Sequence, residues 1–409
     1  MSENSVGHRR RIAVILTLIF VVLVLLLRWW GFLVPSPAPM STERPSHLRI
    51  VWTSNPSREA SIVWSTAVGG SSELRIDAFA ASSTSTPSAI DVACFRGQPY
   101  AAGDAFVHRC VLRALQPSTR YTISVSTDGR TSPPHWFVTA PTDDRSFRLL
   151  FGGDSRSDPV QRRLMNRRIA AMVAEDPGIL ALAHGGDYVA NGRRWSHWQQ
   201  WLDDWGDAIG PTGRILPIIP ARGNHEGFGP LFGEIFAEPG APDYYYLTRI
   251  GSFRLFTLNT ETSLAGDQRE WLAKGLEHES SARWRIAQYH RAAYPAVKMP
   301  SEALRYWVPL FEEHQVDLVF ESDGHALKRT VPIRNAAYDP SGVVYLGEGG
   351  LGVMQRRPQR RWYLKKGGMA ASAHHIHVLS VSADKLEFWA VGADGRELDR
   401  SSRPHRSMR

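Results

Sequence analysis

The chain has 409 residues, of which 43% are hydrophobic and 22% are charged. This composition excludes a fibrous or disordered protein and suits about two globular domains. The formal net charge of +8 fits an anionic partner, either a phosphorylated substrate or a negatively charged membrane surface. No nucleic-acid-binding module is recognisable, so no nucleic-acid partner is expected. Basic side chains far from any motif are interpreted as a solvated face, among them Arg356, Arg357, Arg360 and Arg361.

The N-terminal segment predicts a membrane anchor. Basic residues at positions 8–11 precede an apolar run at residues 12–27, and residues 29–34 extend it to about the 20 residues that a bilayer span needs. Residues 1–34 are therefore predicted to be a cytoplasmic tail and a single signal-anchor transmembrane helix, with the rest of the chain outside the cytoplasm. A signal peptide cleaved near residues 38–40 is the alternative.

The first folded domain is predicted to be an all-β sandwich. Residues 35–47 are rich in Pro and Ser and are interpreted as a linker. Over residues 48–140, short alternating runs are separated by turn residues, at residues 48–52, 60–64, 73–76, 107–112, 121–125 and 136–138. Cys94 and Cys110, the only two cysteines, both fall in this domain. The sequence is compatible with a disulfide between them and with two buried free thiols.

The second domain is predicted over residues 141–400, followed by a tail at 401–409. Its strands alternate with amphipathic helices, which is typical of an α/β fold built from βαβ units. A largely parallel sheet covered by helices on both faces is expected. Helices are predicted after an N-cap at Asp158 and over residues 195–209 and 301–314. Strands are predicted over residues 147–151, 179–183, 215–219, 285–289 and 318–320.

Metal-ligating residue types follow five successive predicted strands. Because the carboxyl ends of parallel strands meet at one edge of a sheet, these side chains are expected to lie together. Oxygen donors mixed with imidazole suit Mn, Fe or Zn, and a carboxylate between two metals can bridge them. The candidates in chain order are Asp154, Asp187, Asn224 with His225, His290, and Asp323 with His325.

These motifs resemble the calcineurin-like metallophosphoesterases and, within them, the purple acid phosphatases. The predicted sandwich is similar to the fibronectin type III-like domain of that subfamily, most clearly at residues 115–121. The resemblance covers residues 48–398. It rests on Gly153-Asp154, Gly186-Asp187, Gly223-Asn224-His225-Glu226, Tyr289-His290 and Asp323-Gly324-His325.

The resemblance implies that the second domain is an α+β metallophosphoesterase sandwich built from βαβ units. It also implies a centre of two divalent or trivalent metal ions. Asp154 and His325 would hold the first metal, Asp187 would bridge, and the second metal would be held by Asn224, His290 and Asp323. His225 would contact the substrate phosphate or protonate the leaving group. The implied activity is acid-phosphatase-like hydrolysis of phosphate monoesters by metal-activated hydroxide. A phosphodiesterase on the same centre and a cell-envelope binding protein with a degenerate metal site are the alternatives.

The chain departs from the subfamily pattern at both metals. Asp323 replaces a histidine, so Mn or Fe is favoured over Zn at the second metal. The expected tyrosine ligand falls on Ala190. An expected histidine falls on Arg156, which is kept as a candidate catalytic residue beside His225. The possible compensating ligands are Asp158, for which an N-cap role is favoured, Tyr188 and Asn191.

Three further features receive structural interpretations. A downstream histidine of the subfamily falls near Met299, which leaves Lys298 as a candidate cationic substitute, although a surface position is favoured for it. The four tryptophans of the predicted helix at 195–209 favour core packing over an aromatic substrate wall, and they are Trp195, Trp198, Trp201 and Trp205. A histidine group at the start of a predicted strand is interpreted as structural, and it comprises His374, His375 and His377.

Overall fold

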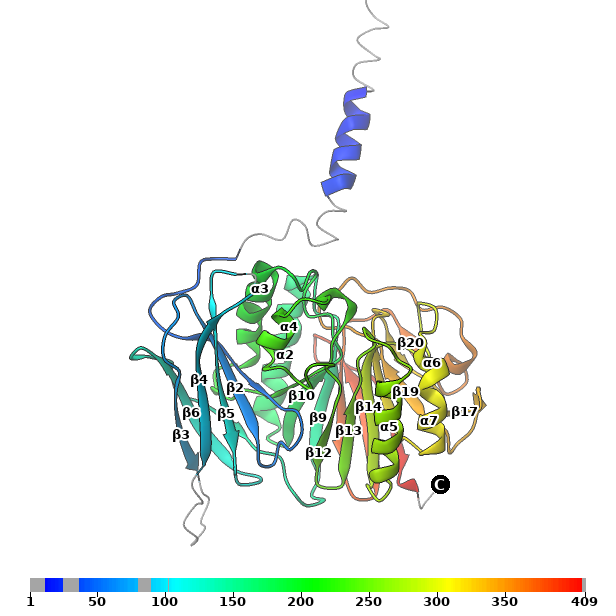
Figure 1. The fold of residues 1–409 in the computed structure, drawn as a ribbon. Coiled ribbons are helices and arrows are strands. Elements are labelled where there is room, and N and C mark those ends of the chain that lie inside the picture. Colours follow the sequence, from blue (N-terminus) through cyan, green and yellow to red (C-terminus); the bar gives the residue numbers. More distant parts are fainter. Residues whose placement is uncertain (1–11, 25–36, 80–89, 102, 407–409) are drawn as a thin grey trace, which may run out of the picture. The chain divides into compact units, whose positions relative to one another are not determined.

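The computed structural model describes residues 12–24, 37–79, 90–101 and 103–406 (Figure 1). The chain divides into two compact units, Met1–Ala38 and Pro39–Arg409. In the first unit, residues 12–24 form a helix. Among the helices within the described ranges, none is both long and apolar enough to cross a bilayer. The predicted transmembrane helix is therefore not supported there, and the rest of the predicted span lies outside the described residues.

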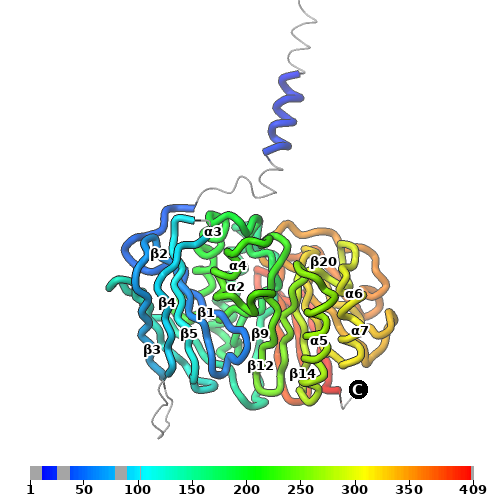
Figure 2. Tube along the Cα trace, viewed as in Figure 1, coloured from blue at the N-terminus to red at the C-terminus, as the bar shows by residue number. Residues whose placement is uncertain are grey.

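The second unit is built around two large β-sheets. The first has ten strands in the order β23-β22-β21-β9-β10-β11-β1-β2-β5-β4. These strands are β1 (Ser46–Val51), β2 (Ala60–Thr66), β4 (Asp91–Pro99), β5 (Phe106–Arg113), β9 (Phe147–Gly152), β10 (Ile179–His184), β11 (Ile218–Pro220), β21 (Ile376–Val381), β22 (Lys385–Val391) and β23 (Glu397–Pro404). The C-terminal strands return to the middle of the unit, where β21 pairs with β9 (Figure 2).

The second large sheet has seven strands in the order β12-β13-β14-β15-β19-β16-β20. They are β12 (Tyr246–Ile250), β13 (Phe253–Thr257), β14 (Trp284–Arg291), β15 (Leu318–Ser322), β16 (Leu327–Arg329), β19 (Val344–Gly347) and β20 (Met369–Ala371). A smaller sheet contains β3 (Glu73–Phe79), β6 (Arg120–Thr127), β7 (Arg130–Thr131) and β8 (His135–Val138). A hairpin pairs β17 (Ile333–Arg334) with β18 (Ala337–Tyr338).

Helices cover the outer faces of the two large sheets. The helices α2 (Pro159–Glu175), α3 (Trp195–Trp205) and α4 (Leu231–Ile235) share a buried apolar cluster with β9 and β10. The helices α5 (Asp267–His278), α6 (Ala303–Tyr306) and α7 (Val308–Glu313) share another with β14 and β15. Short 3-10 turns lie at Gly206–Ala208, Asn224–Glu226 and Trp362–Leu364. The order of layers is helices, sheet, sheet, helices, which places α2 and α5 on opposite sides (Figure 1).

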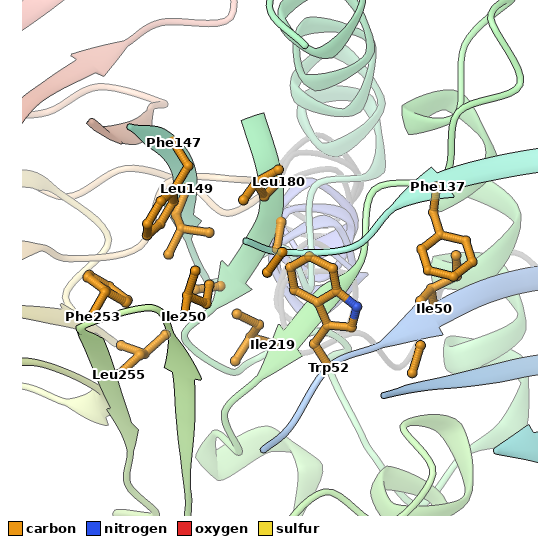
Figure 3. Close-up of a cluster of buried hydrophobic side chains, with 14 of the residues drawn as sticks. Ile50, Trp52, Phe137, Phe147, Leu149, Leu180, Ile219, Ile250, Phe253 and Leu255 are labelled. Atoms are coloured by element: carbon orange, nitrogen blue, oxygen red, sulfur yellow. The ribbon is translucent and has the colours of Figure 1, made fainter. Parts of the chain in front are cut away.

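This layering differs from the single sheet with helices on both faces that the strand and helix pattern predicts, and it agrees with the α+β sandwich that the resemblance implies. The inner faces of the two large sheets pack directly on each other, and Leu149 and Leu180 of one sheet share a cluster with Phe253 and Leu255 of the other (Figure 3). Burying each such side chain stabilises the fold by about 1.5–3 kcal/mol. A fully apolar strand looks the same in sequence whether a helix or a second sheet covers it, so the pattern did not reveal the stacking.

Four strands of the predicted sandwich region, β1, β2, β4 and β5, extend the large ten-stranded sheet, and the other four form the smaller sheet. Strand β1 pairs in parallel with β11, with Val51 opposite Ile218, and antiparallel with β2. Ile50 and Trp52 belong to the same buried cluster as Ile219 (Figure 3). One hydrophobic core therefore runs from the N-terminal strands into the strands that carry the predicted metal ligands.

Local sequence signals explain the helix boundaries. The Asp158 carboxylate accepts a hydrogen bond from the Gln161 amide at 3.1 Å, so it caps α2 as predicted. The predicted helix at 301–314 is instead two short helices that meet at Trp307, and Pro309 lies in the first turn of the second. Proline is tolerated there because that turn needs no backbone donor. The four tryptophans of α3 are buried, which agrees with core packing.

The two cysteines form a disulfide. Cys94 on β4 lies opposite Cys110 on β5, with their Cα atoms 4.0 Å apart. This resolves the choice left open by the sequence, and it suits an oxidising compartment. Strand β4 is at the edge of its sheet and is mostly exposed, so the covalent link fastens a strand that buries little apolar surface.

Removing this link should destabilise the folded state. We expect the Cys94→Ser/Cys110→Ser variant to lose about 3 kcal/mol of unfolding free energy, because a bridge across a loop of this length restricts the unfolded chain by that amount. Urea denaturation of the two proteins, in oxidising and in reducing buffer, measures the difference. Equal midpoints in oxidising buffer would contradict the expectation.

Candidate metal centre

The candidate site residues converge at one edge of the stacked sheets. The positions are Asp154 and Arg156 after β9, Asp187 after β10, Asn224 and His225 in the turn after β11, His290 on β14, and Asp323 and His325 after β15. Their contacts with one another, given below, bring all of the predicted site residues into one cluster. Chain segments far apart in sequence thus supply a single site, as expected for the carboxyl ends of adjacent strands.

Four of these residues have a left-handed backbone conformation that non-glycine residues rarely adopt. The φ angles are 54° at Asp154, 58° at Asp187, 71° at Asp323 and 60° at His325. Each costs of order 1–3 kcal/mol and persists only where the surroundings enforce it. Backbone hydrogen bonds do so: the Asp154 amide donates to the Gly186 carbonyl at 2.9 Å, and the His325 amide donates to the Glu348 carbonyl at 2.8 Å. Strain concentrated on the predicted ligands is typical of a functional site.

His290 is oriented as a metal ligand. Its Nδ1 donates to the Gly185 carbonyl oxygen at 2.9 Å, which leaves Nε2 to face the cluster. Nε2 lies 3.1 Å from Asn224 Oδ1, 3.2 Å from Asp187 Oδ1 and 3.6 Å from Asp323 Oδ1. Three oxygen atoms that can ligate a metal therefore lie around one imidazole nitrogen. This donor set matches the predicted second metal site.

The electrostatics of this cluster favour a cation. Burial disfavours a charged imidazole, yet the carboxylates of Asp187 and Asp323 outweigh it and hold the pKa of His290 well above its ordinary value. Asp154, Asp187 and His290 each offer a ligand atom, and these atoms lie within 4.8 Å of one another. A metal ion would replace the proton that the carboxylates stabilise on His290.

The predicted first metal site contains two buried polar atoms without hydrogen-bond partners. Asp154 Oδ1 and His325 Nε2 lie 3.2 Å apart, and neither forms a hydrogen bond. The other oxygen of Asp154 accepts from the Asp323 amide at 2.9 Å. Leaving such groups unpaired is costly, so the pair fits a metal ion that both would ligate. Gly349 is required beside it, because a Cβ there would lie 1.9 Å from Asp154 Oδ2.

Arg156 and His225 lie beside Oδ2 of Asp187, the carboxylate oxygen that does not contact His290. Arg156 Nε donates to Asp187 Oδ2 at 3.2 Å, and His225 Nε2 lies 3.8 Å from the same oxygen. The Ala190 carbonyl accepts from His225 Nδ1 at 2.8 Å, so Nε2 faces the centre. The His225 side chain is 30% exposed, unlike the buried ligands, and can meet a substrate.

None of the three candidate compensating ligands faces the first metal site. Tyr188 is buried, stacks on the His184 ring, and donates its hydroxyl to the His184 carbonyl at 3.3 Å. Asn191 accepts from the Arg193 amide at 3.0 Å, and Asp158 caps α2. Their side chains are held by other contacts, so the first site has fewer protein donors than the second.

Lys298 is exposed, as predicted, and it also contacts the candidate metal centre. Its Nζ forms an ion pair with Asp323 Oδ1, although 41% of the side chain remains exposed. The sequence places Lys298 in a loop without a motif, and only the fold brings it to the centre. It also lines a cavity of about 580 Å³ beside Asp323, together with Thr260, Glu261, Arg291 and Ser301.

Glu226, the last residue of the Gly-Asn-His-Glu motif, holds the backbone of the site in place. The sequence alone did not predict this role. Glu226 is fully buried and accepts from the backbone amides of Asp187 at 2.9 Å, Tyr188 at 2.9 Å and Gly223 at 2.8 Å. These bonds fasten the loop that carries Asp187 to the turn that carries Asn224. Burial raises the pKa of Glu226 to about 8. Its place at the end of the Gly-Asn-His-Glu motif was the available signal.

Comparisons with known proteins agree with this geometry. Residues 45–139 match the purple acid phosphatase N-terminal domain, and residues 157–327 match the calcineurin-like phosphoesterase model. An uncharacterised protein of Mycobacterium tuberculosis is 27% identical over 281 residues, which is 56% of this chain and 52% of that protein. Purple acid phosphatase 1 of Ipomoea batatas is 26% identical over 283 residues, covering 60% of this chain and 59% of the relative. This chain therefore spans about half the length of the first of these relatives.

A solved structure supports the fold. A purple acid phosphatase from seeds of yellow lupin, Lupinus luteus, superposes with a TM-score of 0.70 at 18% identity. The superposition covers 88% of this chain and 74% of that one. The phosphoesterase match spans Asp187, Asn224, His290, Asp323 and His325, so the chain carries a purple acid phosphatase N-terminal domain followed by a calcineurin-like phosphoesterase domain.

Proposed function

We propose that the protein hydrolyses phosphate monoesters in the manner of an acid phosphatase. The observation that carries this proposal is the convergence of six candidate metal-ligating side chains from five strands, including the buried facing atoms Asp154 Oδ1 and His325 Nε2. The cavity of about 580 Å³ beside Asp323 leaves room for the alcohol part of an ester. The relatives named as purple acid phosphatases support the same reaction class.

In this proposal each candidate site residue has a separate role in hydrolysis. Asp154 and His325 would hold one metal and Asn224, His290 and Asp323 the other, with Asp187 between them. Bound metal ions supply Lewis-acid stabilisation of the phosphate and lower the pKa of water toward about 7. His225 would hold the proton for the leaving oxygen at Nε2, because its Nδ1 is engaged by Ala190. Arg156 keeps Asp187 oriented and adds positive charge beside the phosphate.

Paired aryl phosphate substrates test the proposal. Purified protein loaded with Mn²⁺ should hydrolyse a monoester with a higher kcat/KM than the matching diester. A reversed preference would assign a phosphodiesterase to the same centre. Absence of hydrolysis of both, with metal bound, would favour a binding protein.

The ligand set predicts metal preference and colour. We infer that the second site prefers Mn²⁺ or Fe²⁺ to Zn²⁺, because Asp323 supplies a carboxylate where the subfamily has an imidazole. No strong visible band is expected, since Ala190 occupies the tyrosine position and the Tyr188 hydroxyl is bonded to His184. After chelation, manganese should restore more activity than zinc, and the iron-loaded protein should lack a violet band. Reactivation by zinc alone would contradict the argument from Asp323.

We also propose that the N-terminal segment attaches the enzyme to a membrane, with residues 39–409 outside the cytoplasm. The apolar residues 12–24 and the Cys94–Cys110 disulfide support this orientation. Cell fractionation should place the full chain with membranes, and protease added to cells with a permeable outer layer should digest residues 39–409. A mature N-terminus near Met40 would show a cleaved signal instead.

A further inference from the structure

A run of unpaired positive charge lies in the loop between β19 and β20. Residues 356–366, called here the basic loop, contain four arginines, two lysines and no acidic residue. Arg357 and Arg360 are exposed, and within the described ranges no carboxylate lies within ion-pair distance of any of the six cations. Many other surface arginines are paired with a carboxylate, as Arg396 is with Asp394 and Arg400 is with Glu397. Such an excess of one charge attracts anions.

Hydrogen bonds fasten the basic loop to the candidate metal centre. The Arg356 amide donates to the His325 carbonyl at 2.8 Å, so the loop begins against a metal ligand. The Gln359 amide donates to the Ala296 carbonyl at 2.7 Å, and Arg361 Nη2 donates to the Lys298 carbonyl at 3.1 Å. Lys298 lines the cavity beside the centre. The loop therefore backs one wall of the proposed substrate cavity.

The cations inside the cavity are already matched by carboxylates. Arg291 makes two hydrogen bonds to Glu261, at 2.8 and 3.1 Å, and Lys298 is paired with Asp323. Surplus positive charge near the centre is therefore concentrated on the basic loop. An anionic group at the metals would leave the charge of the loop available to a second anionic group of the same molecule.

From this arrangement we propose that the basic loop is a second anion-binding site of the enzyme, and that the substrate is a phosphate ester with another phosphate group. The proposal rests on the function proposed above, because the reacting phosphate occupies the metal centre. Guanidinium groups suit a phosphate because their donors match its oxygens in pairs. Attachment of the loop to the cavity wall favours this role over a membrane-facing one.

The test compares a hexose bisphosphate with the matching hexose monophosphate. The variant is Arg357→Gln/Arg360→Gln in the full chain, since both side chains are exposed and the fold does not depend on them. We expect the ratio of kcat/KM for the bisphosphate over the monophosphate to fall about tenfold, the effect of losing a charge-assisted contact. The control is Arg96→Gln/Arg130→Gln, which removes the same charge from exposed positions on β4 and β7 and should leave the ratio unchanged.

A binding measurement separates this inference from the proposed function. Calorimetric titration of both sugars into the full chain carrying His225→Ala needs no turnover, so a preference for the bisphosphate that disappears with Arg357→Gln/Arg360→Gln would support the second site even without hydrolysis. An equal loss for both sugars would show general charge attraction and overturn the proposal. An unchanged ratio, with weaker binding to vesicles containing anionic lipid, would assign the loop to a membrane surface and overturn it as well.

Discussion

Replacing His290 with alanine should lower kcat about a thousandfold or more while the protein stays folded. The imidazole faces three oxygen donors of the second metal site, and its loss removes several kcal/mol of stabilisation of the phosphate transition state. Asn224→Ala should act in the same direction, because Asn224 Oδ1 lies 3.1 Å from His290 Nε2 and belongs to the same site. Steady-state kinetics and metal analysis of the purified variants measure both effects.

The matched control is His278→Ala, at the exposed end of α5. It removes the same side chain far from the centre and should leave kcat and metal content unchanged. Thermal unfolding of all three variants shows whether any loss reflects folding. Normal turnover by metal-loaded His290→Ala would remove His290 from the ligand set and, with it, the assignment of the second site.

His225→Ala should lower kcat about a hundredfold to a thousandfold while metal content stays at the wild-type value. His225 is partly exposed and its Nε2 faces the centre, so its expected role is proton transfer to the leaving oxygen. The loss should be smaller with an aryl ester whose leaving group needs no proton than with an alkyl ester. Loss of metal from this variant would make His225 a ligand instead.

The positions of the candidate ligands could be predicted because they lie at the ends of strands that the sequence reveals. Strands β9, β10 and β15 are short apolar runs followed by a candidate ligand within a few residues, and β14 carries His290 near its end, so periodicity and parallel-sheet geometry were sufficient. Roles and metal assignments came only from family resemblance. The sequence gives the order of the candidate ligands along the chain, but it does not show which of them lie close together in space.

Other features depend on contacts that no local pattern encodes. Strand β4 was not predicted because it lies at a sheet edge with both faces largely exposed, so its sequence lacks alternation. The contact of Lys298 with Asp323 joins a loop to a strand end, and a lysine in a loop is ordinarily solvated. The two sheets stack because apolar side chains far apart in sequence are buried against each other. In the sequence this stacking is visible only as apolar strands.

The parallel pairing of β1 with β11 has a consequence for how the chain folds. Strand β1 leaves the ribosome well before β11, so one edge of β1 stays open until Ile218 is available to pair with Val51. The N-terminal strands therefore cannot finish folding as a separate module during synthesis. Non-local closure of this kind is slow. The open edge of β1 therefore remains available for pairing until the segment leading into Asn224 has been synthesised.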